Sequence, residues 1–110
     1  MFKVDDNNIL VIRGDTGSFN IQIVDAAGEE VTLNENDALT FTLRRSASHP
    51  SILLQKYIDV AALTLLIKPE DTADLQFGKY VYDIQLRAAD GSVDTIIPPH
   101  SFEVLEEVTY

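Results

Sequence analysis

The sequence predicts an all-β protein, an immunoglobulin-like antiparallel β-sandwich of seven or eight short strands. Three observations predict this fold. Apolar and polar residues alternate with a period of two along most of the chain, turn residues recur about every ten residues, and one stretch alone favours a helix. Its 110 residues suffice for one hydrophobic core, so we expect a single domain over residues 1–110.

Seven alternating segments define the expected strands in chain order. They cover residues 18–23, 39–44, 52–58, 63–68, 80–87, 93–97 and 102–105. The segment 80–87 alternates most regularly. Residues 57–67 also fit a buried helix, because Ala61 and Ala62 interrupt the β-branched run, but the flanking alternation favours a strand, a loop and a strand.

Glycine and proline mark the turns between these strands. Asp90-Gly91 is the sharpest turn signal, since Gly adopts the positive φ that a tight turn needs. We expect Pro98-Pro99 to break the preceding strand, which leaves residues 102–105 as its continuation or as a separate final strand, and to confine it near a sheet edge. At most one short helical turn is expected, near residues 70–76, because Pro69 and the acidic residues after it suit a helix N-terminus.

One short motif supports the sandwich. Tyr80 follows Gly78 at the start of the most regular strand, two residues before the next core position. This spacing is that of a tyrosine corner, in which the hydroxyl of a Tyr bonds to upstream backbone and locks a crossover between sheets. The alternative is that Tyr80 is an ordinary aromatic core residue, and both interpretations fit a sandwich.

The charge of the chain excludes several classes of function. Eight Lys and Arg against 18 Asp and Glu give a net charge of −10, which disfavours binding to nucleic acid and to anionic membranes. No cysteine is present, which removes disulfides, thiol nucleophiles and Cys-ligated metals. The sequence shows neither a signal-peptide core near Met1 nor an apolar run long enough for a membrane span.

Residue types that carry catalysis or bind metals show no informative spacing. His49 and His100 both neighbour prolines and lack a second ligand nearby. The densest acidic pairs, Asp71 with Asp74 and Asp5 with Asp6, match neither a calcium loop nor a glycosidase pattern. We therefore predict no enzyme, no catalytic residue, no cofactor and no metal site.

The sequence hints instead at association. Strict alternation would turn six apolar residues toward solvent, which suggests a covered surface. These residues are Leu53, Tyr57, Leu66, Val81, Ile96 and Leu105. A partner subunit would cover them; the alternatives are loops of the same chain or its last residues, 104–110.

A series of motifs points to a family. Ile12 to Thr16 leads to Phe19; Gly78-Lys-Tyr-Val-Tyr-Asp-Ile-Gln-Leu86 follows, and then Gly91-Ser-Val-Asp-Thr-Ile96 and Phe102-Glu-Val104. From about Ile9 to Thr109, the chain resembles the N-terminal immunoglobulin-like domain of phage baseplate upper proteins, known from phages and prophages of Gram-positive bacteria. In those proteins further sequence follows the domain, so we expect either a stand-alone protein or a fragment.

The resemblance implies a non-enzymatic virion structural protein of tail or baseplate type, made in the host bacterial cytoplasm and assembled into the virion. Its partners would be other virion proteins, or further copies in a homo-oligomer, reached through sheet edges and apolar outer patches. Five residues would serve as its scaffold: Gly14, Asp15, Gly78, Tyr80 and Tyr82. The alternative function is a small carbohydrate-binding or ligand-binding β-sandwich, for which Tyr57 and Tyr110 are the possible exposed aromatic residues.

Overall fold

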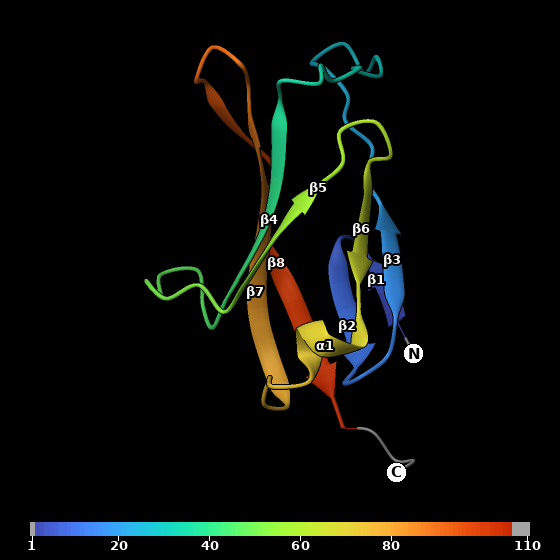
Figure 1. The fold of residues 1–110 in the computed structure, drawn as a ribbon, viewed down its shortest axis with the longest axis vertical. Coiled ribbons are helices and arrows are strands. Elements are labelled where there is room, and N and C mark those ends of the chain that lie inside the picture. Colours follow the sequence, from blue (N-terminus) through green and yellow to red (C-terminus); the bar gives the residue numbers. More distant parts are fainter. Residues whose placement is uncertain (1, 107–110) are drawn as a thin grey trace.

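Two β-sheets face each other in the computed structural model, which describes residues 2–106 (Figure 1). Within these residues the larger sheet has six strands, in the spatial order β1-β2-β8-β7-β4-β5. Their bounds are β1 Phe2–Asp5, β2 Asn8–Ile12, β8 Val93–Leu105, β7 Gly78–Arg87, β4 Ala38–Arg44 and β5 Leu54–Ile58. The smaller sheet pairs β3 (Gly17–Asn20) with β6 (Thr64–Ile67), and helix α1 (Pro69–Thr72) follows β6.

The prediction of an all-β sandwich is confirmed. Strands β4, β7 and β8 lie in one sheet and β3 and β6 in the other, as strands C, F and G face B and E in an immunoglobulin sandwich. One pair, β2 with β8, runs parallel, with Ile9 opposite Phe102 and Ile12 opposite Leu105. Because most of the chain connects these two strands, no tight turn imposes an antiparallel direction on them.

The N-terminal hairpin of β1 and β2 is absent from the predicted strands. Asp6 and Asn7 connect the two strands with φ angles of 49° and 66°, the positive values that a type I′ turn requires. Asp and Asn tolerate this conformation better than most residues, so the sequence did carry a signal. The hairpin also explains Gly17, where a Cβ would lie 2.0 Å from the ring of Phe2.

Most other strand predictions agree with the structure, with small shifts at the ends. Strand β5 begins two residues later than predicted, and β3 ends at Asn20 although Ile21 and Ile23 beyond it remain buried. The backbone N–H of Ile21 donates to the carbonyl of Leu63 over 2.7 Å. Residues 57–67 form a strand, a loop and a strand, as predicted.

The predicted break at Pro98-Pro99 is wrong, because β8 runs through both prolines. Residues 102–105 are therefore the continuation of the strand, one of the two alternatives that the sequence left open. Tyr82 pairs with His100 and Ile84 pairs with Ile97, so a single residue of β7 faces the two prolines across a bulge. Strand β2 pairs only with residues 102–105 of β8. The prolines therefore lie where β8 has a neighbour on one side alone, and the expected edge position holds for this part of the strand.

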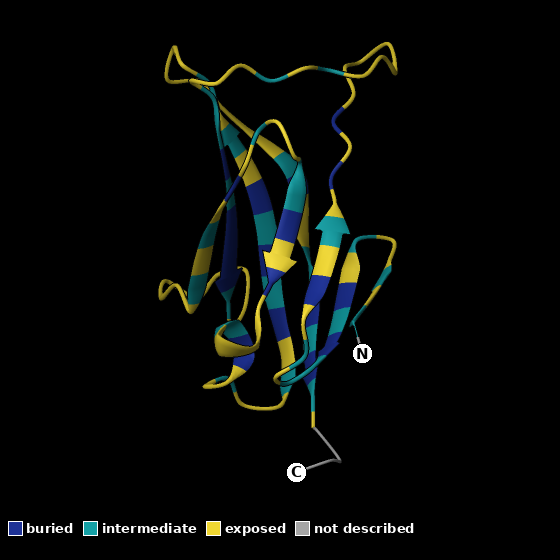
Figure 2. Cartoon of the chain, turned by 45° about the vertical axis from the view of Figure 1, so that its right-hand side comes forward, coloured by how far each residue is buried: buried dark blue, intermediate teal, exposed yellow. Residues whose placement is uncertain are grey.

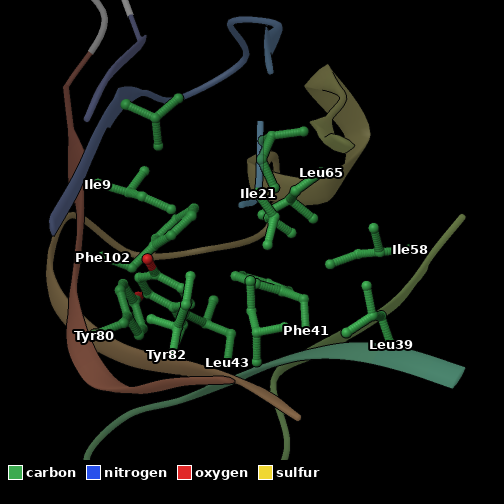
Figure 3. Packing of buried hydrophobic residues seen from close by; sticks show 14 of the residues in the cluster. Ile9, Ile21, Leu39, Phe41, Leu43, Ile58, Leu65, Tyr80, Tyr82 and Phe102 are labelled. Atoms are coloured by element: carbon green, nitrogen blue, oxygen red, sulfur yellow. The ribbon is translucent and has the colours of Figure 1, made fainter. Parts of the chain in front are cut away.

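The core lies between the two sheets and centres on three aromatic rings (Figure 3). The ring centroids of Phe41 and Tyr82 are 5.3 Å apart, and Phe102 lies 6.0 Å from Phe41. Aliphatic side chains from both sheets, including Leu39, Leu43 and Leu65, surround the rings and are fully buried. Burial alternates from residue to residue along β7, and Figure 2 shows bands of buried and less buried residues along the strands.

Candidate interaction surface

A tyrosine corner fixes the start of β7. The Tyr80 hydroxyl donates to the carbonyl oxygen of Gln76 over 2.6 Å, and Gly78 between them has a φ of 134°, which favours glycine. The guanidinium of Arg45 lies 4.8 Å from the centre of the Tyr80 ring. Gly78 and Tyr80 therefore hold the connection between the two sheets, the position predicted for scaffold residues.

The turn after β2 is tied to the same region. The backbone N–H of Gly14 donates to the fully buried hydroxyl of Thr72 over 2.9 Å, and the N–H of Asp15 donates to the Ile12 carbonyl. The guanidinium of Arg13 lies 4.5 Å from the centre of the Phe77 ring. These contacts place the Gly14 turn against α1.

The remaining predicted scaffold residue, Tyr82, lies in the aromatic core. Its hydroxyl donates to the carbonyl oxygen of Asn7, which fastens the β1–β2 turn to β7. Burial raises the pKa of the Tyr82 phenol well above its ordinary value of 10.0.

An ion pair closes one side of the sandwich. Strands β5 and β6 lie at edges of their sheets in the described part of the chain. Lys56 points inward from β5, and its Nζ donates to the Leu66 carbonyl over 2.6 Å and to the Asp71 carboxylate over 2.5 Å. Asp71 also accepts from the backbone N–H of Lys68 at the start of α1. An inward-pointing charge on an edge strand discourages pairing with another chain, so this side is poorly suited to strand addition.

The six predicted interface residues do not form one patch. Tyr57, Leu53 and Leu66 are exposed, with 79%, 44% and 43% of their surface accessible. Tyr57 projects from the outer face of the larger sheet, whereas Leu66 lies on the smaller sheet and Leu53 in the loop before β5.

The other three candidates are half-buried. Val81 and Leu105 lie on the outer face of the larger sheet, since their neighbours along each strand point into the core. Ile96 is the extra residue of a second bulge in β8 and packs against the core instead of facing a partner. The suggested cover by residues 104–110 is described only in part: Val104 is buried in the core, and residues 107–110, with Tyr110, lie outside the described residues.

The outer face of the larger sheet carries a mostly polar surface around Tyr57. Thr40 on β4 lies between Tyr57 on β5 and Gln85 on β7, and the next row places Thr42 beside Gln55. The Gln55 amide donates to the Thr42 hydroxyl over 3.3 Å. A shallow hollow lies over these rows, lined by Ala38, Thr40, Thr42, Gln55, Tyr57, Gln85, Arg87 and Val93.

A second hollow also has Tyr57 in its lining. It runs between the start of β4 and the loop after β5, and is lined by Glu35, Asp37, Ala38, Leu39, Tyr57, Ile58, Asp59, Val60 and Ala61. Ala38 and Tyr57 line both hollows. Tyr57 is the only one of these residues predicted from the sequence as a site residue, because the segments 35–39 and 57–61 meet only through the fold.

The side chains that carry catalysis or bind metals stay apart. Among residues 2–106, His, Asp and Glu side chains form no group of three or more that could hold a metal ion. Asp71, one of the acidic residues weighed for calcium, binds Lys56 and caps α1. The His49 ring accepts from the backbone N–H of Ser51, and the His100 ring contacts the Pro98 carbonyl.

Comparison with protein-family models, with curated proteins and with solved structures gives no match for this sequence. Helices long and apolar enough to cross a membrane are absent from the described part of the chain. The geometry of the sandwich and its surface therefore carries the functional argument.

Proposed function

We propose that this chain is a non-enzymatic virion structural protein of a phage or prophage, a tail-type or baseplate-type module that docks onto other virion subunits. The observation that carries the proposal is the outer surface around Tyr57, an exposed aromatic side chain presented by a β-sandwich with a well-packed core. The resemblance of the sequence to baseplate upper protein domains supports the virion as its place of action. Before assembly the chain would reside in the host bacterial cytoplasm.

The composition of this surface supports docking to a protein. Tyr and Arg are enriched in the centres of protein interfaces, and both occur here, as Tyr57 and Arg87. The neighbouring Thr40, Gln55 and Gln85 supply hydroxyl and amide groups for hydrogen bonds. Since β4, β5 and β7 are paired in one sheet, these side chains project from a backbone that is ordered before a partner arrives.

The test uses particles released from the source bacterium after prophage induction. Particles purified on a density gradient are probed with antibodies against this chain, by immunoblot and by electron microscopy. We expect the chain to sediment with intact particles and the antibodies to label the tail. Absence of the chain from intact particles would overturn the proposal.

A carbohydrate-binding function is the second candidate, and the exposure of Tyr57 favours it. An exposed ring beside Gln55 and Gln85 offers a stacking surface with hydrogen-bonding groups nearby. A glycan array separates the two functions. A reproducible hit on one class of glycan, lost in Tyr57→Ala, would replace assembly with carbohydrate recognition, whereas an array without hits favours assembly.

Self-association is tested by light scattering coupled to size exclusion over a concentration series. A discrete oligomer would indicate that copies of the chain dock onto one another, and Leu66→Asp and Val81→Asp then identify the face that they use. Leu66 is more exposed than Val81, so we expect Leu66→Asp to leave folding intact and Val81→Asp to cost some stability. A monomer at all concentrations directs the search to a different virion protein.

A further inference from the structure

The negative charge of the chain is unevenly distributed. The loop end consists of residues 24–37, 59–63 and 88–92, which connect strands at the upper end of the sandwich in Figure 1. These segments contain seven of the 18 acidic residues and none of the eight Lys and Arg residues. No basic residue occurs from Ile21 to Leu43. Most of the net charge of −10 therefore lies at one end.

The loop end is held together by backbone and side-chain hydrogen bonds. The Asp37 carboxylate accepts from the N–H of Asn34 over 2.9 Å and from the N–H of Ala89 over 3.3 Å, which joins two of the three segments. The Asp59 carboxylate accepts from the N–H groups of Ala61 and Ala62. Both carboxylates are thereby fixed at the surface.

The second hollow described above lies at this end and combines an apolar floor with an acidic rim. We call it the loop-end groove. The accessible apolar part of its lining consists of Ala38, Tyr57, Val60 and Ala61, since Leu39 and Ile58 are buried. Its rim carries Glu35, Asp37 and Asp59. Because Ala38 and Tyr57 line both this groove and the hollow on the polar face of the larger sheet, the two hollows adjoin, and together they suit an extended segment better than a small molecule.

We propose that the loop-end groove binds an extended, basic segment of a partner protein. Lys or Arg side chains of the segment pair with the rim carboxylates, while its apolar side chains lie on the floor and against the Tyr57 ring. Charge complementarity selects this occupant, because a local excess of carboxylates repels acidic segments and attracts basic ones. The inference rests on the proposed docking function and specifies the chemistry of the partner.

The probe for this inference is a short synthetic peptide of alternating Arg and Leu, compared with the same peptide carrying Glu in place of Arg. Both are titrated into ¹⁵N-labelled full chain at an ionic strength of about 0.15 M, which screens distant charges. We expect saturable binding of the Arg peptide, with amide shifts concentrated in residues 35–39 and 57–61. The Glu peptide should not bind.

Matched variants separate the groove from the overall charge. Glu35→Gln with Asp59→Asn should weaken the Arg peptide about fivefold, the sum of two rim contacts. Glu70→Gln with Asp74→Asn changes the net charge equally at the other end of the sandwich and should change affinity less than about twofold. Tyr57→Ala should weaken binding at least about tenfold, as expected of a central aromatic contact.

Any of three results would contradict peptide binding in the loop-end groove. They are no saturable binding of the Arg peptide, amide shifts scattered over the surface, or an equal loss of affinity in the two charge-matched pairs of variants. The particle experiment remains a separate test of the docking function. If the chain is present in virions but does not bind the Arg peptide, the proposed function stands and the proposed role of the loop-end groove is refuted. If the chain binds the Arg peptide at the loop-end groove but is absent from virions, the binding site stands and the proposed virion function is refuted.

Discussion

The two ends of the sandwich differ in what holds them. The corner end consists of residues 13–16 and 68–80, and two of its contacts join parts of the chain that lie far apart in sequence: the Thr72 hydroxyl accepts from the N–H of Gly14, and Lys56 pairs with the Asp71 carboxylate. The Tyr80 hydroxyl adds a local bond to the carbonyl of Gln76. At the loop end, carboxylates of Asp25, Asp37, Asp59 and Asp90 bond mostly to backbone N–H groups a few residues away.

This difference separates structural from interacting parts of the molecule. Contacts that join elements distant in sequence stabilise the fold, and they concentrate in the core and at the corner end. Local turns leave their outward carboxylates at the surface, where charge serves recognition more than stability. Substitutions at the two ends should therefore affect different properties, stability at one and binding at the other.

The largest effect is expected in the core that both ends share. Phe41→Ala removes a fully buried ring that contacts Tyr82 and Phe102, and should lower the free energy of unfolding by about 4 kcal/mol. Tyr57→Ala on the adjacent strand is the control and should change it by less than about 0.5 kcal/mol. Urea denaturation measures both. A comparable loss in Tyr57→Ala would mean that the outer face also supports the fold.

The ion pair at the corner end should give the next effect. Asp71→Ala leaves Lys56 without its carboxylate and Lys68 N–H without its acceptor, so we expect a loss of about 2 kcal/mol in thermal or urea denaturation. Asp74→Ala removes an exposed carboxylate a few residues away and should change stability by less than about 0.5 kcal/mol. An equal loss of stability in the two variants would mean that the Lys56–Asp71 ion pair contributes no more than an exposed carboxylate nearby.

Alkaline pH tests the buried phenol of Tyr82. Its pKa is raised above 10.0 in the folded chain, so the unfolded chain loses the proton first and folding stability falls as pH rises above 10.0. Tyr82→Phe removes this titration and should flatten the loss, while also removing the hydrogen bond to Asn7 at neutral pH. Unfolding followed by fluorescence across this range measures both effects. An unchanged alkaline slope in Tyr82→Phe would assign the loss to other groups.

The smallest effect is expected at the loop end, from Asp90. Hydrogen bonds from the backbone and side chain of Ser92 lower the pKa of Asp90 below 3.8. The contribution of Asp90 to folding stability is therefore present above pH 3.8 and is lost as the pH falls below that value. Asp90→Asn should change folding stability only at acidic pH, and only slightly, because the Asp90 carboxylate is fully exposed. NMR titration of Asp90 measures the pKa, and a value above 3.8 would contradict the assigned contacts.

Local alternation was sufficient to predict the central strands. Tyr80 to Arg87 and Leu39 to Arg44 each have one buried face, and a period of two follows directly from that burial. The position of a residue relative to strands that are distant in sequence could not be predicted from local alternation. Strand β8 can run through Pro98-Pro99 because β2 pairs only with residues 102–105 and so needs no N–H group from the prolines. Ile96 turns toward the core because a bulge shifts the register of β8 against β7.

The candidate site was predictable only through Tyr57. An exposed aromatic at an outward strand position is visible in the sequence, and the structure places it at 79% exposure. The groove beside it is formed by Glu35 to Leu39 and Tyr57 to Ala61, which are separated along the chain and meet because Leu39 of β4 pairs with Ile58 of β5. A count of acidic residues reveals the charge but does not show that a groove lies among them.

Photo-crosslinking in assembled particles tests whether the surface around Tyr57 docks onto another virion protein. A photo-reactive phenylalanine derivative replaces Tyr57 in one variant and Leu66, on the smaller sheet, in the other. We expect a specific crosslink from position 57 to a basic segment of another virion protein, identified by mass spectrometry, and a weaker one or none from position 66. Crosslinking from position 66 alone, or from position 57 to an acidic segment, would contradict this docking.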